Sequence, residues 1–359
     1  MSPSYMNRTT DLRDLRKKRY DFLRCRDLRR EFEACVVHHL DGQTMKADEG
    51  LNFEARGLLV TGESRLGKTT EVRSLVDEFN NSGVKLEDGR PAKIVSCTLR
   101  GTVTWKNLGA KTLDALGYPC SDNRTSSQYW SKVLHQMRAQ GVMGIYYDEV
   151  QHVFKRPAKG ANQAAAINDQ NKIIRDSFKA LMKEADWPVM LIFSGVPELS
   201  DHILPFEELR ELLNPVHFEP IDLDVVRSYF VDTEDGIKEI MRSDRDELLS
   251  LLYGYSDFSG VDITPFLKHR FLDRLVFACG YRWGLVIELI IEVLASGMKR
   301  TSKTISIDDF VYQYSRKSRV PLEFSPFTHP NYRKAYNPIK LLEDIDANEK
   351  IIKTKRYKR

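Results

Sequence analysis

Eight residues, Gly62 to Thr69, constrain the fold of this chain more than any other feature. They read Gly-Glu-Ser-Arg-Leu-Gly-Lys-Thr and fit G-x-x-x-x-G-K-[ST], a pattern in which backbone N–H groups of a Gly-rich loop wrap phosphate oxygens. A short apolar run, 57–61, comes before the loop, and residues 70–79 after it have helical apolar spacing. Strand, loop and helix therefore follow in the order that aims a helix N-terminus at a bound anion.

The same motif predicts which residues meet a nucleotide. Lys68 is expected to meet the β and γ phosphate oxygens, and the hydroxyl of Thr69 is expected to hold Mg²⁺. The other predicted contacts of the nucleotide are Gly62, Glu63, Ser64, Arg65, Leu66, Gly67 and Thr70. The sequence thus predicts a site for ATP and Mg²⁺, because a Gly-rich turn with a coincidental Lys-Thr pair leaves the flanking strand and helix unexplained.

Further short apolar runs follow the loop at intervals that leave room for helices. These runs are 92–97, 142–147, 189–193 and 216–218, and the amphipathic stretches between them are 105–116, 127–139 and 170–185. Strands that alternate with helices predict an α/β fold, a parallel sheet covered by helices on both faces. After Pro220 the pattern predicts helices only, in segments near 225–230, 237–253, 267–278 and 285–296.

These patterns predict four parts of the chain. They are a basic N-terminal helical segment (1–50), a nucleotide-binding core (51–220), a small helical lid (221–300) and a basic tail that binds partners (301–359). The tail contains four prolines and little periodicity, so we expect an extended segment with one short helix at 339–345.

The charges of the chain gather at its two ends. The net charge is only +4, but residues 11–30 carry nine Lys or Arg against four Asp, and residues 350–359 are basic again. Basic ends on a nearly neutral body indicate contact with phosphate backbones or with an acidic partner. A solvated helix face and a frayed tail are the alternative interpretation.

Composition narrows the class of protein. No apolar run approaches the ~20 residues that a membrane span requires, and residues 1–6 lead into charged residues without the apolar region of a secretory signal. Five scattered cysteines without a C-x-x-C pattern indicate neither a disulfide framework nor a zinc site. We expect a cytoplasmic protein without membrane contact, whose cysteines are small buried side chains.

Two carboxylates follow the apolar run 142–147. Asp148 is expected to complete the Mg²⁺ shell, and Glu149 is expected to orient or deprotonate the attacking water. A pair of acids at a strand end is common in itself, and solvated acids in a turn are the alternative. The position of Asp148 and Glu149 in the sequence, after the loop that contains Lys68 and Thr69, favours the catalytic interpretation.

Three further residues are candidates for the chemistry. Ser194 ends the run 189–193, where a polar side chain can touch the γ-phosphate or the water; a turn-forming Ser-Gly is the alternative. Arg210 precedes the last core run and is predicted to insert into a neighbouring subunit's site. Arg282 begins a helix of the lid and is predicted to report the nucleotide state. For each arginine a surface salt bridge is the alternative.

With these residues placed, the chain resembles an AAA+ ATPase, and within that superfamily it resembles the TniB and TnsC transposition regulators, relatives of the phage protein MuB. The resemblance spans about residues 30–330. The residues that carry it are 62–70, 147–152, 193–199, 99–119 and 325–327.

The resemblance implies a function on DNA. Such regulators bind double-stranded DNA without sequence preference in their ATP state, polymerise along it as a helical filament or ring, and pass the target to a transposase and a TniQ-like adaptor. Hydrolysis then favours disassembly. By the same resemblance, Lys106 and Thr125 face the channel of the oligomer and grip phosphates, and Lys155 and Arg156 add to that surface.

Two other functions remain open. One is an initiator or loader of the origin-recognition type, although residues 300–359 are short and proline-broken for the winged-helix domain that such proteins usually carry. The other is a signalling NTPase of a defence system, although no effector or repeat array is visible in the chain.

Overall fold

The computed structural model describes residues 13–18, 20, 22–119, 124–155, 161–233, 236–337, 340 and 343. The chain forms two compact units. One unit is Cys25–Glu219, and the other combines Met1–Arg24 with Pro220–Arg359. We describe each unit by itself.

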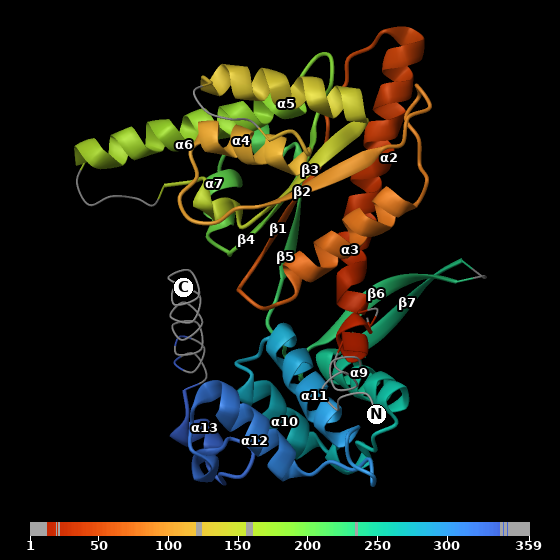
Figure 1. The fold of residues 1–359 in the computed structure, drawn as a ribbon, viewed down its shortest axis with the longest axis vertical. Coiled ribbons are helices and arrows are strands. Elements are labelled where there is room, and N and C mark those ends of the chain that lie inside the picture. The colour runs from red at the N-terminus through yellow and green to blue at the C-terminus, as the bar shows by residue number, and fades with distance from the viewer. Residues whose placement is uncertain are drawn as a thin grey trace, which may run out of the picture. The chain divides into compact units, whose positions relative to one another are not determined.

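A five-stranded parallel sheet forms the centre of the first unit (Figure 1). Its strands are β1 (Gly57–Gly62), β2 (Lys93–Thr98), β3 (Val142–Asp148), β4 (Met190–Gly195) and β5 (Leu213–Phe218). The order across the sheet is β2-β3-β4-β1-β5, and every pairing is parallel. All positions of β1, β3 and β4 are buried, which explains why the sequence shows them as continuous apolar runs.

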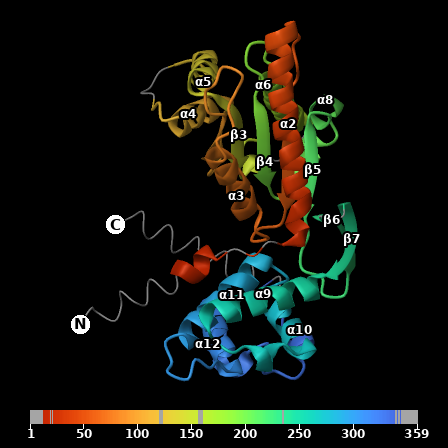
Figure 2. The same cartoon turned by 90° about the vertical axis from the view of Figure 1, so that its right-hand side faces the viewer.

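Helices cover both faces of this sheet. They are α2 (Arg26–Glu49), α3 (Lys68–Asn81), α4 (Trp105–Ala115), α5 (Ser126–Gln140) and α6 (Ala161–Met182), with the short η2 (Val150–His152), α7 (Leu199–Ile203) and α8 (Glu207–Arg210). The short η1 (Leu23–Cys25) spans the boundary between the two units in the sequence. Figure 1 shows α2 and α3 on one side of the sheet and α4, α5 and α6 on the other. Figure 2 shows α2 crossing the sheet. The predicted α/β fold is confirmed.

Alternate strand residues point to opposite faces of the sheet, as the period of two requires. Leu59, Tyr147 and Phe193 belong to one buried cluster with Trp130 of α5 and Phe178 of α6. The ring centroids of Phe178 and Phe193 lie 4.7 Å apart. Burying each such side chain stabilises the fold by roughly 1.5–3 kcal/mol. The strands β1, β3 and β4 are therefore held in place by a well-packed hydrophobic core.

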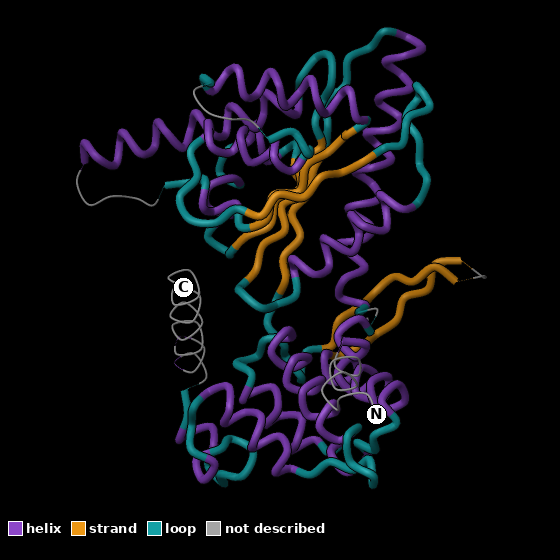
Figure 3. The backbone as a smooth tube through the Cα atoms, viewed as in Figure 1, coloured by secondary structure: helices purple, strands orange, loops and turns teal. Residues whose placement is uncertain are grey.

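The second unit begins with a β-hairpin and continues as helices. The hairpin consists of β6 (Val226–Thr233) and β7 (Gly236–Ser243), drawn in orange in Figure 3. The helices that follow are α9 (Asp244–Ser259), η3 (Thr264–Phe266), α10 (His269–Ala278), α11 (Trp283–Gly297), α12 (Ile307–Ser318), η4 (Leu322–Phe324) and α13 (Tyr332–Ala335).

The expectation of helices only after Pro220 is wrong for the hairpin. Tyr229 is buried, whereas its neighbour Phe230 is 62% exposed, which is the alternation of a strand with one covered face. The apolar run 225–230 is too short for its sequence alone to distinguish the two-residue period of a strand from the 3.6-residue period of a helix. In β7, Ile237 and Met241 are likewise exposed, so part of the expected helix 237–253 is a strand.

The predicted division of the chain also differs from the observed units. Helix α2 belongs to the unit of the sheet and not to a separate N-terminal segment. Helix α12 lies within the expected tail, yet its Phe310 is buried and its ring centroid lies 5.7 Å from that of Phe327. Of the expected helix at 339–345, only residues 340 and 343 are described.

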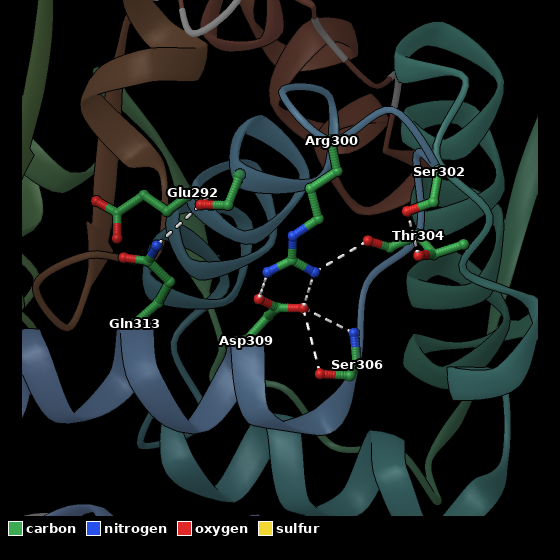
Figure 4. Close-up of polar contacts among 8 residues, drawn as sticks. Glu292, Arg300, Ser302, Thr304, Ser306, Asp309 and Gln313 are labelled. Atoms are coloured by element: carbon green, nitrogen blue, oxygen red, sulfur yellow. Dashed lines mark hydrogen bonds and ion pairs between the residues drawn. The ribbon is translucent and has the colours of Figure 1, made fainter.

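The carboxylate of Asp309 joins α12 to the connection that precedes this helix (Figure 4). Asp309 Oδ2 accepts hydrogen bonds from Arg300 Nη1 at 2.8 Å and from the backbone N–H of Ser306 at 2.7 Å. Asp309 thereby caps α12 and pairs with the connection that precedes it. Burial raises the pKa of Asp309, but the hydrogen bonds from Arg300 and Ser306 outweigh burial, and the net shift is downward.

Replacing Asp309 by Asn is expected to lower the free energy of unfolding by about 1 kcal/mol at neutral pH, because the charged acceptor is lost. The wild-type carboxylate has a lower pKa in the folded state, so its contribution is complete above about pH 4 and is lost as the pH falls through the folded pKa. The difference between the two proteins should therefore shrink in acid. Thermal unfolding from pH 3 to pH 7 measures it, with the exposed Asp308→Asn as the control that should show a smaller effect.

Candidate nucleotide-binding site

The loop from Gly62 to Lys68 joins β1 to α3, and its backbone needs its glycines. Gly62 and Gly67 have φ angles of 147° and 97°. Residues with a Cβ atom rarely adopt such angles, whereas glycine adopts them readily. A Cβ on Gly62 would lie 2.5 Å from the carbonyl oxygen of Phe218. Helix α3 starts at Lys68 with Gly67 as its N-cap. The first N–H groups of this helix have no partner within the helix, so they suit an anion.

Lys68 is buried inside this loop. Its Nζ donates hydrogen bonds to the carbonyl oxygens of Gly62 at 2.7 Å and of Glu63 at 2.8 Å. Burial lowers the pKa of Lys68, while the charges of Glu149 and Asp148 raise it. An ammonium group in such a poorly solvated place attracts phosphate oxygens more strongly than one in bulk water.

A cluster of hydroxyl groups surrounds the buried carboxylate of Asp148. Asp148 Oδ1 accepts a hydrogen bond from Thr69 Oγ1 at 3.1 Å and another from Ser194 Oγ at 2.5 Å. The hydroxyl of Tyr146 lies 2.9 Å from Ser194 Oγ. Burial and the charge of Asp148 raise the pKa of Tyr146, so its hydroxyl stays protonated. Three predicted site residues, Thr69, Asp148 and Ser194, thus meet at one point.

These residues fit a complex of Mg²⁺ with ATP. Magnesium prefers hard oxygen ligands, and the hydroxyl of Thr69 lies beside the carboxylate of Asp148. Phosphate oxygens suit the backbone N–H groups of the loop and the ammonium of Lys68. Ser194, in contrast, is fully buried and donates a hydrogen bond to Asp148, which suits orientation of the metal ligand.

Glu149 occupies a strained backbone position at the end of β3. Its φ and ψ angles are 64° and 44°, a left-handed conformation that costs a residue with a Cβ about 1–2 kcal/mol. Gln151 Nε2 donates a hydrogen bond to Glu149 Oε2. The conformation turns the chain sharply after the strand, so the half-buried carboxylate of Glu149 stands at the edge of the sheet next to Asp148.

Sequence reasoning missed three residues of this region: Tyr146, Gln151 and Arg73. Arg73 Nη2 lies 3.9 Å from Asp148 Oδ2 and donates a hydrogen bond to Thr98 Oγ1 at 2.6 Å. Arg73 comes four residues after Thr69, so the helical repeat places both on one face of α3. That spacing was visible in the sequence. Neither Tyr146 nor Gln151 has such a signal.

The two predicted arginines lie outside this cluster. Arg210 is the exposed last residue of α8 and comes just before β5. Strand β5 ends at Phe218 beside Gly62, and six residues of strand span about 20 Å. Arg210, which precedes β5, therefore lies near the amino-terminal ends of the strands, opposite the phosphate loop. Arg282 is the N-cap of α11 in the other unit, and its role stays a prediction.

The residues predicted to contact DNA start two adjacent helices. Lys106 is the second residue of α4, and Thr125 is the N-cap of α5. The rings of Trp105 and Trp130 stack at a centroid distance of 4.2 Å, and Trp130 Nε1 donates to the Trp105 carbonyl oxygen at 3.1 Å. The structure therefore holds the first turns of α4 and α5 together.

The loop after Glu149 is described only in part. The backbone N–H and carbonyl of Lys155 pair with the side chain of Asn171 on α6, at 2.9 Å and 3.0 Å. This anchors Lys155 at the end of the turn. Arg156, the fourth residue predicted to contact DNA, lies outside the described residues.

One protein-family model matches part of the chain. Residues 51–203 match a family model described as an AAA domain. This stretch contains the phosphate loop, Asp148, Glu149 and Ser194, and the fold is the AAA+ type of P-loop fold that the sequence predicted. No curated protein matches the chain. Among the described residues, no helix is long and apolar enough to cross a membrane.

Solved structures with a similar backbone include three proteins with 11–13% identity to this chain. The ORC1 protein of Aeropyrum pernix, in complex with DNA, is 12% identical, with 80% of this chain and 69% of that chain covered and a TM-score of 0.49. The Cdc6p protein of Pyrobaculum aerophilum is 13% identical (78% and 65%, TM-score 0.46). The ORC2 protein of Aeropyrum pernix in its ADP form is 11% identical (79% and 67%, TM-score 0.49). This chain thus spans about two thirds of their length.

Replacing Ser194 by Ala is expected to weaken Mg²⁺-dependent nucleotide binding about tenfold, because the carboxylate of Asp148 loses the donor that orients it. Titration of a fluorescent ATP analogue at several Mg²⁺ concentrations measures the effect. Tyr146→Phe is the control, since it keeps the bond from Ser194 to Asp148 and should change binding less. Equal affinities of Ser194→Ala and wild type at every Mg²⁺ concentration would contradict this assignment.

Proposed function

We propose that this protein is an ATPase that assembles on double-stranded DNA in its ATP-bound form and regulates DNA transposition. The observation that carries the nucleotide part is the meeting of Thr69, Asp148 and Ser194 beside the loop that holds Lys68. The transposition part rests on the motifs at 62–70, 147–152 and 193–199 and on the resemblance that they carry.

Each residue of the site has a role in hydrolysis. Thr69 and Asp148 would hold Mg²⁺, which offsets phosphate charge when it is bound. Lys68 and the loop N–H groups hold the β and γ phosphates in place. Glu149 orients the attacking water and accepts its proton. ATP is thereby converted to ADP and phosphate.

Assembly would complete the site from a second subunit. Arg210 is exposed and lies toward the edge of the sheet opposite the phosphate loop. This position supports a contact with the nucleotide of a neighbouring copy rather than its own, where the charge of Arg210 would stabilise the transferring phosphoryl group. In this proposal Arg282 reports the nucleotide state to the helical unit.

The paired first turns of α4 and α5 support contact with DNA. Two helix N-termini side by side favour phosphate oxygens, and the exposed Lys106 adds a positive charge. Contacts of this kind fix a duplex without reading its bases. Lys155 and Arg156 would extend this surface, and a transposase with a TniQ-like adaptor would be the partners of the assembled state.

An origin-recognition-type initiator is the second candidate, since it shares the nucleotide site. Within the described part of residues 244–337 there are helices and no strands, so this part does not have the β-wing of a winged helix. Binding to random DNA and to origin-like repeats separates the two candidates, because an initiator prefers particular sequences.

The Glu149→Gln variant is expected to hydrolyse ATP at least a hundredfold more slowly and to remain assembled on DNA, because ATP is bound but not cleaved. The Lys68→Ala variant should neither bind ATP nor assemble. Phosphate release and negative-stain microscopy, with and without double-stranded DNA at low salt, test both expectations. Absence of any assembly of the wild type with ATP and DNA would count against the proposal.

Replacing Lys106 by Ala is expected to weaken DNA binding several-fold and to reduce the slope of log affinity against log salt by about one, because one phosphate contact is lost. Fluorescence anisotropy with labelled duplexes at several salt concentrations measures the slope. Lys93→Ala is the matched control, since Lys93 is exposed at the opposite end of β2. An unchanged slope in Lys106→Ala would remove Lys106 from the DNA surface.

A further inference from the structure

Arg175, on α6, is a buried arginine that contacts no acidic side chain. The residue is only 8% exposed. Within the part of the chain that the structure describes, its guanidinium forms no ion pair and no hydrogen bond, and its Nε is completely buried. A buried charged group with unpaired donors destabilises the folded state, so packing alone does not explain an arginine at this position.

The contact that Arg175 does make is with an aromatic ring. Its Cζ lies 3.3 Å from the ring centroid of Phe206, the N-cap of α8. The face of an aromatic ring attracts a guanidinium group, but it leaves the N–H groups in the guanidinium plane without acceptors. The ring therefore fixes the orientation of the guanidinium and leaves its edge available to a ligand.

The charges near Arg175 do not compensate for its burial. Burial lowers the pKa of Arg175, and the charge of Asp176 opposes this shift only in part. Asp176 is exposed, and adjacent residues of a helix do not face each other. His202 is a base, and its pKa is lowered by burial and then by the charge of Arg175. Neither neighbour supplies the acceptor that the guanidinium lacks.

Arg175 lines a cavity of about 450 Å³ between α6 and the segment 205–209. This volume lies within the range of pockets that enclose a small ligand or a partner's side chains. The apolar lining of the cavity comes from Pro205, Phe206 and Leu209. The cavity thus combines apolar walls with one unpaired guanidinium group.

The other charged residues of the cavity favour a single negative charge over a polyanion. Lys179 Nζ donates a hydrogen bond to Glu208, so the charge of Lys179 is already matched. Lys172 and Glu207 are exposed and also line the cavity. Glu207 and Glu208 would repel the closely spaced phosphates of a nucleic acid. One carboxylate with apolar neighbours, in contrast, fits both the guanidinium and the apolar lining.

We propose that this cavity binds one carboxylate of a protein partner, an Asp or Glu side chain flanked by apolar residues. The planar guanidinium of Arg175 donates parallel hydrogen bonds to the two carboxylate oxygens. The apolar neighbours of that carboxylate pack against Pro205 and Phe206. The cavity is separate from the nucleotide site, so the inference goes beyond the proposed function and holds for either candidate function.

The test uses the full chain and two capped peptides as probes, acetyl-Leu-Glu-Leu-amide and acetyl-Leu-Gln-Leu-amide, which differ by one charge. In titrations followed by ligand-observed NMR, wild type is expected to bind the Glu peptide at least about tenfold more tightly, the effect of hydrogen bonds between charged groups. Arg175→Met keeps an unbranched side chain without the guanidinium and should lose this preference. Acetate and inorganic phosphate, which have no apolar neighbours, should not displace the Glu peptide at equal concentration.

Two further variants separate binding from folding. Arg138→Met is the matched control, because Arg138 is an exposed arginine near the end of α5, and it should keep the preference. Glu207→Lys changes an exposed residue of the cavity and leaves Arg175 in place, so it should tighten binding of the Glu peptide a few-fold. The melting temperature of Arg175→Met should equal or exceed that of wild type, since an unpaired buried charge is removed.

Three outcomes would overturn the inference. Equal affinity of wild type for the two peptides, or displacement of the Glu peptide by acetate or phosphate at equal concentration, would show that the cavity does not select a peptide carboxylate. A preference kept in Arg175→Met would place the binding elsewhere. A large fall in the melting temperature of Arg175→Met, with unchanged peptide binding in Glu207→Lys, would make Arg175 a structural residue. These measurements involve neither ATP nor DNA, so such a failure leaves the proposed function untouched.

Discussion

The buried carboxylate of Asp148 is the interaction on which the rest of the site depends. A buried charge is stable only when it is paired and hydrogen-bonded, and here the hydroxyls of Thr69 and Ser194 both donate to one of its oxygens. Arg73 lies 3.9 Å from the other oxygen. Burial lowers the pKa of Lys68, and the charges of Glu149 and of this carboxylate partly oppose that shift. One acidic side chain thereby fixes α3, β3 and β4 relative to one another.

The strand order explains how residues far apart in sequence reach that carboxylate. Strand β4 lies between β3 and β1, and all three run in parallel, so their carboxyl ends meet at one edge. The register pairs Asp148 with Ser194 and Gly195 with Thr61. Ser194 consequently stands between the acid and the phosphate loop.

The sequence was enough to predict the sheet and the centre of the site, because buried parallel strands appear as apolar runs and their ends mark the site. Asp148 and Ser194 follow from that rule, and Thr69 follows from the phosphate-loop motif. The hairpin β6–β7 did not, since its exposed Phe230 and Ile237 look like core residues in a sequence. Gln151 could not be predicted either. Its bond to Glu149 depends on a left-handed backbone and on the space left by Gly195, and neither is visible in residue types.

The left-handed backbone at Glu149 connects the proposed nucleotide site with the proposed DNA surface. A left-handed residue directly after β3 reverses the chain, and this reversal brings the carbonyl of His152 to the N–H of Val103 at the entrance to α4. The geometry that places the carboxylate of Glu149 at the sheet edge is therefore the geometry that ties its turn to the segment bearing Lys106.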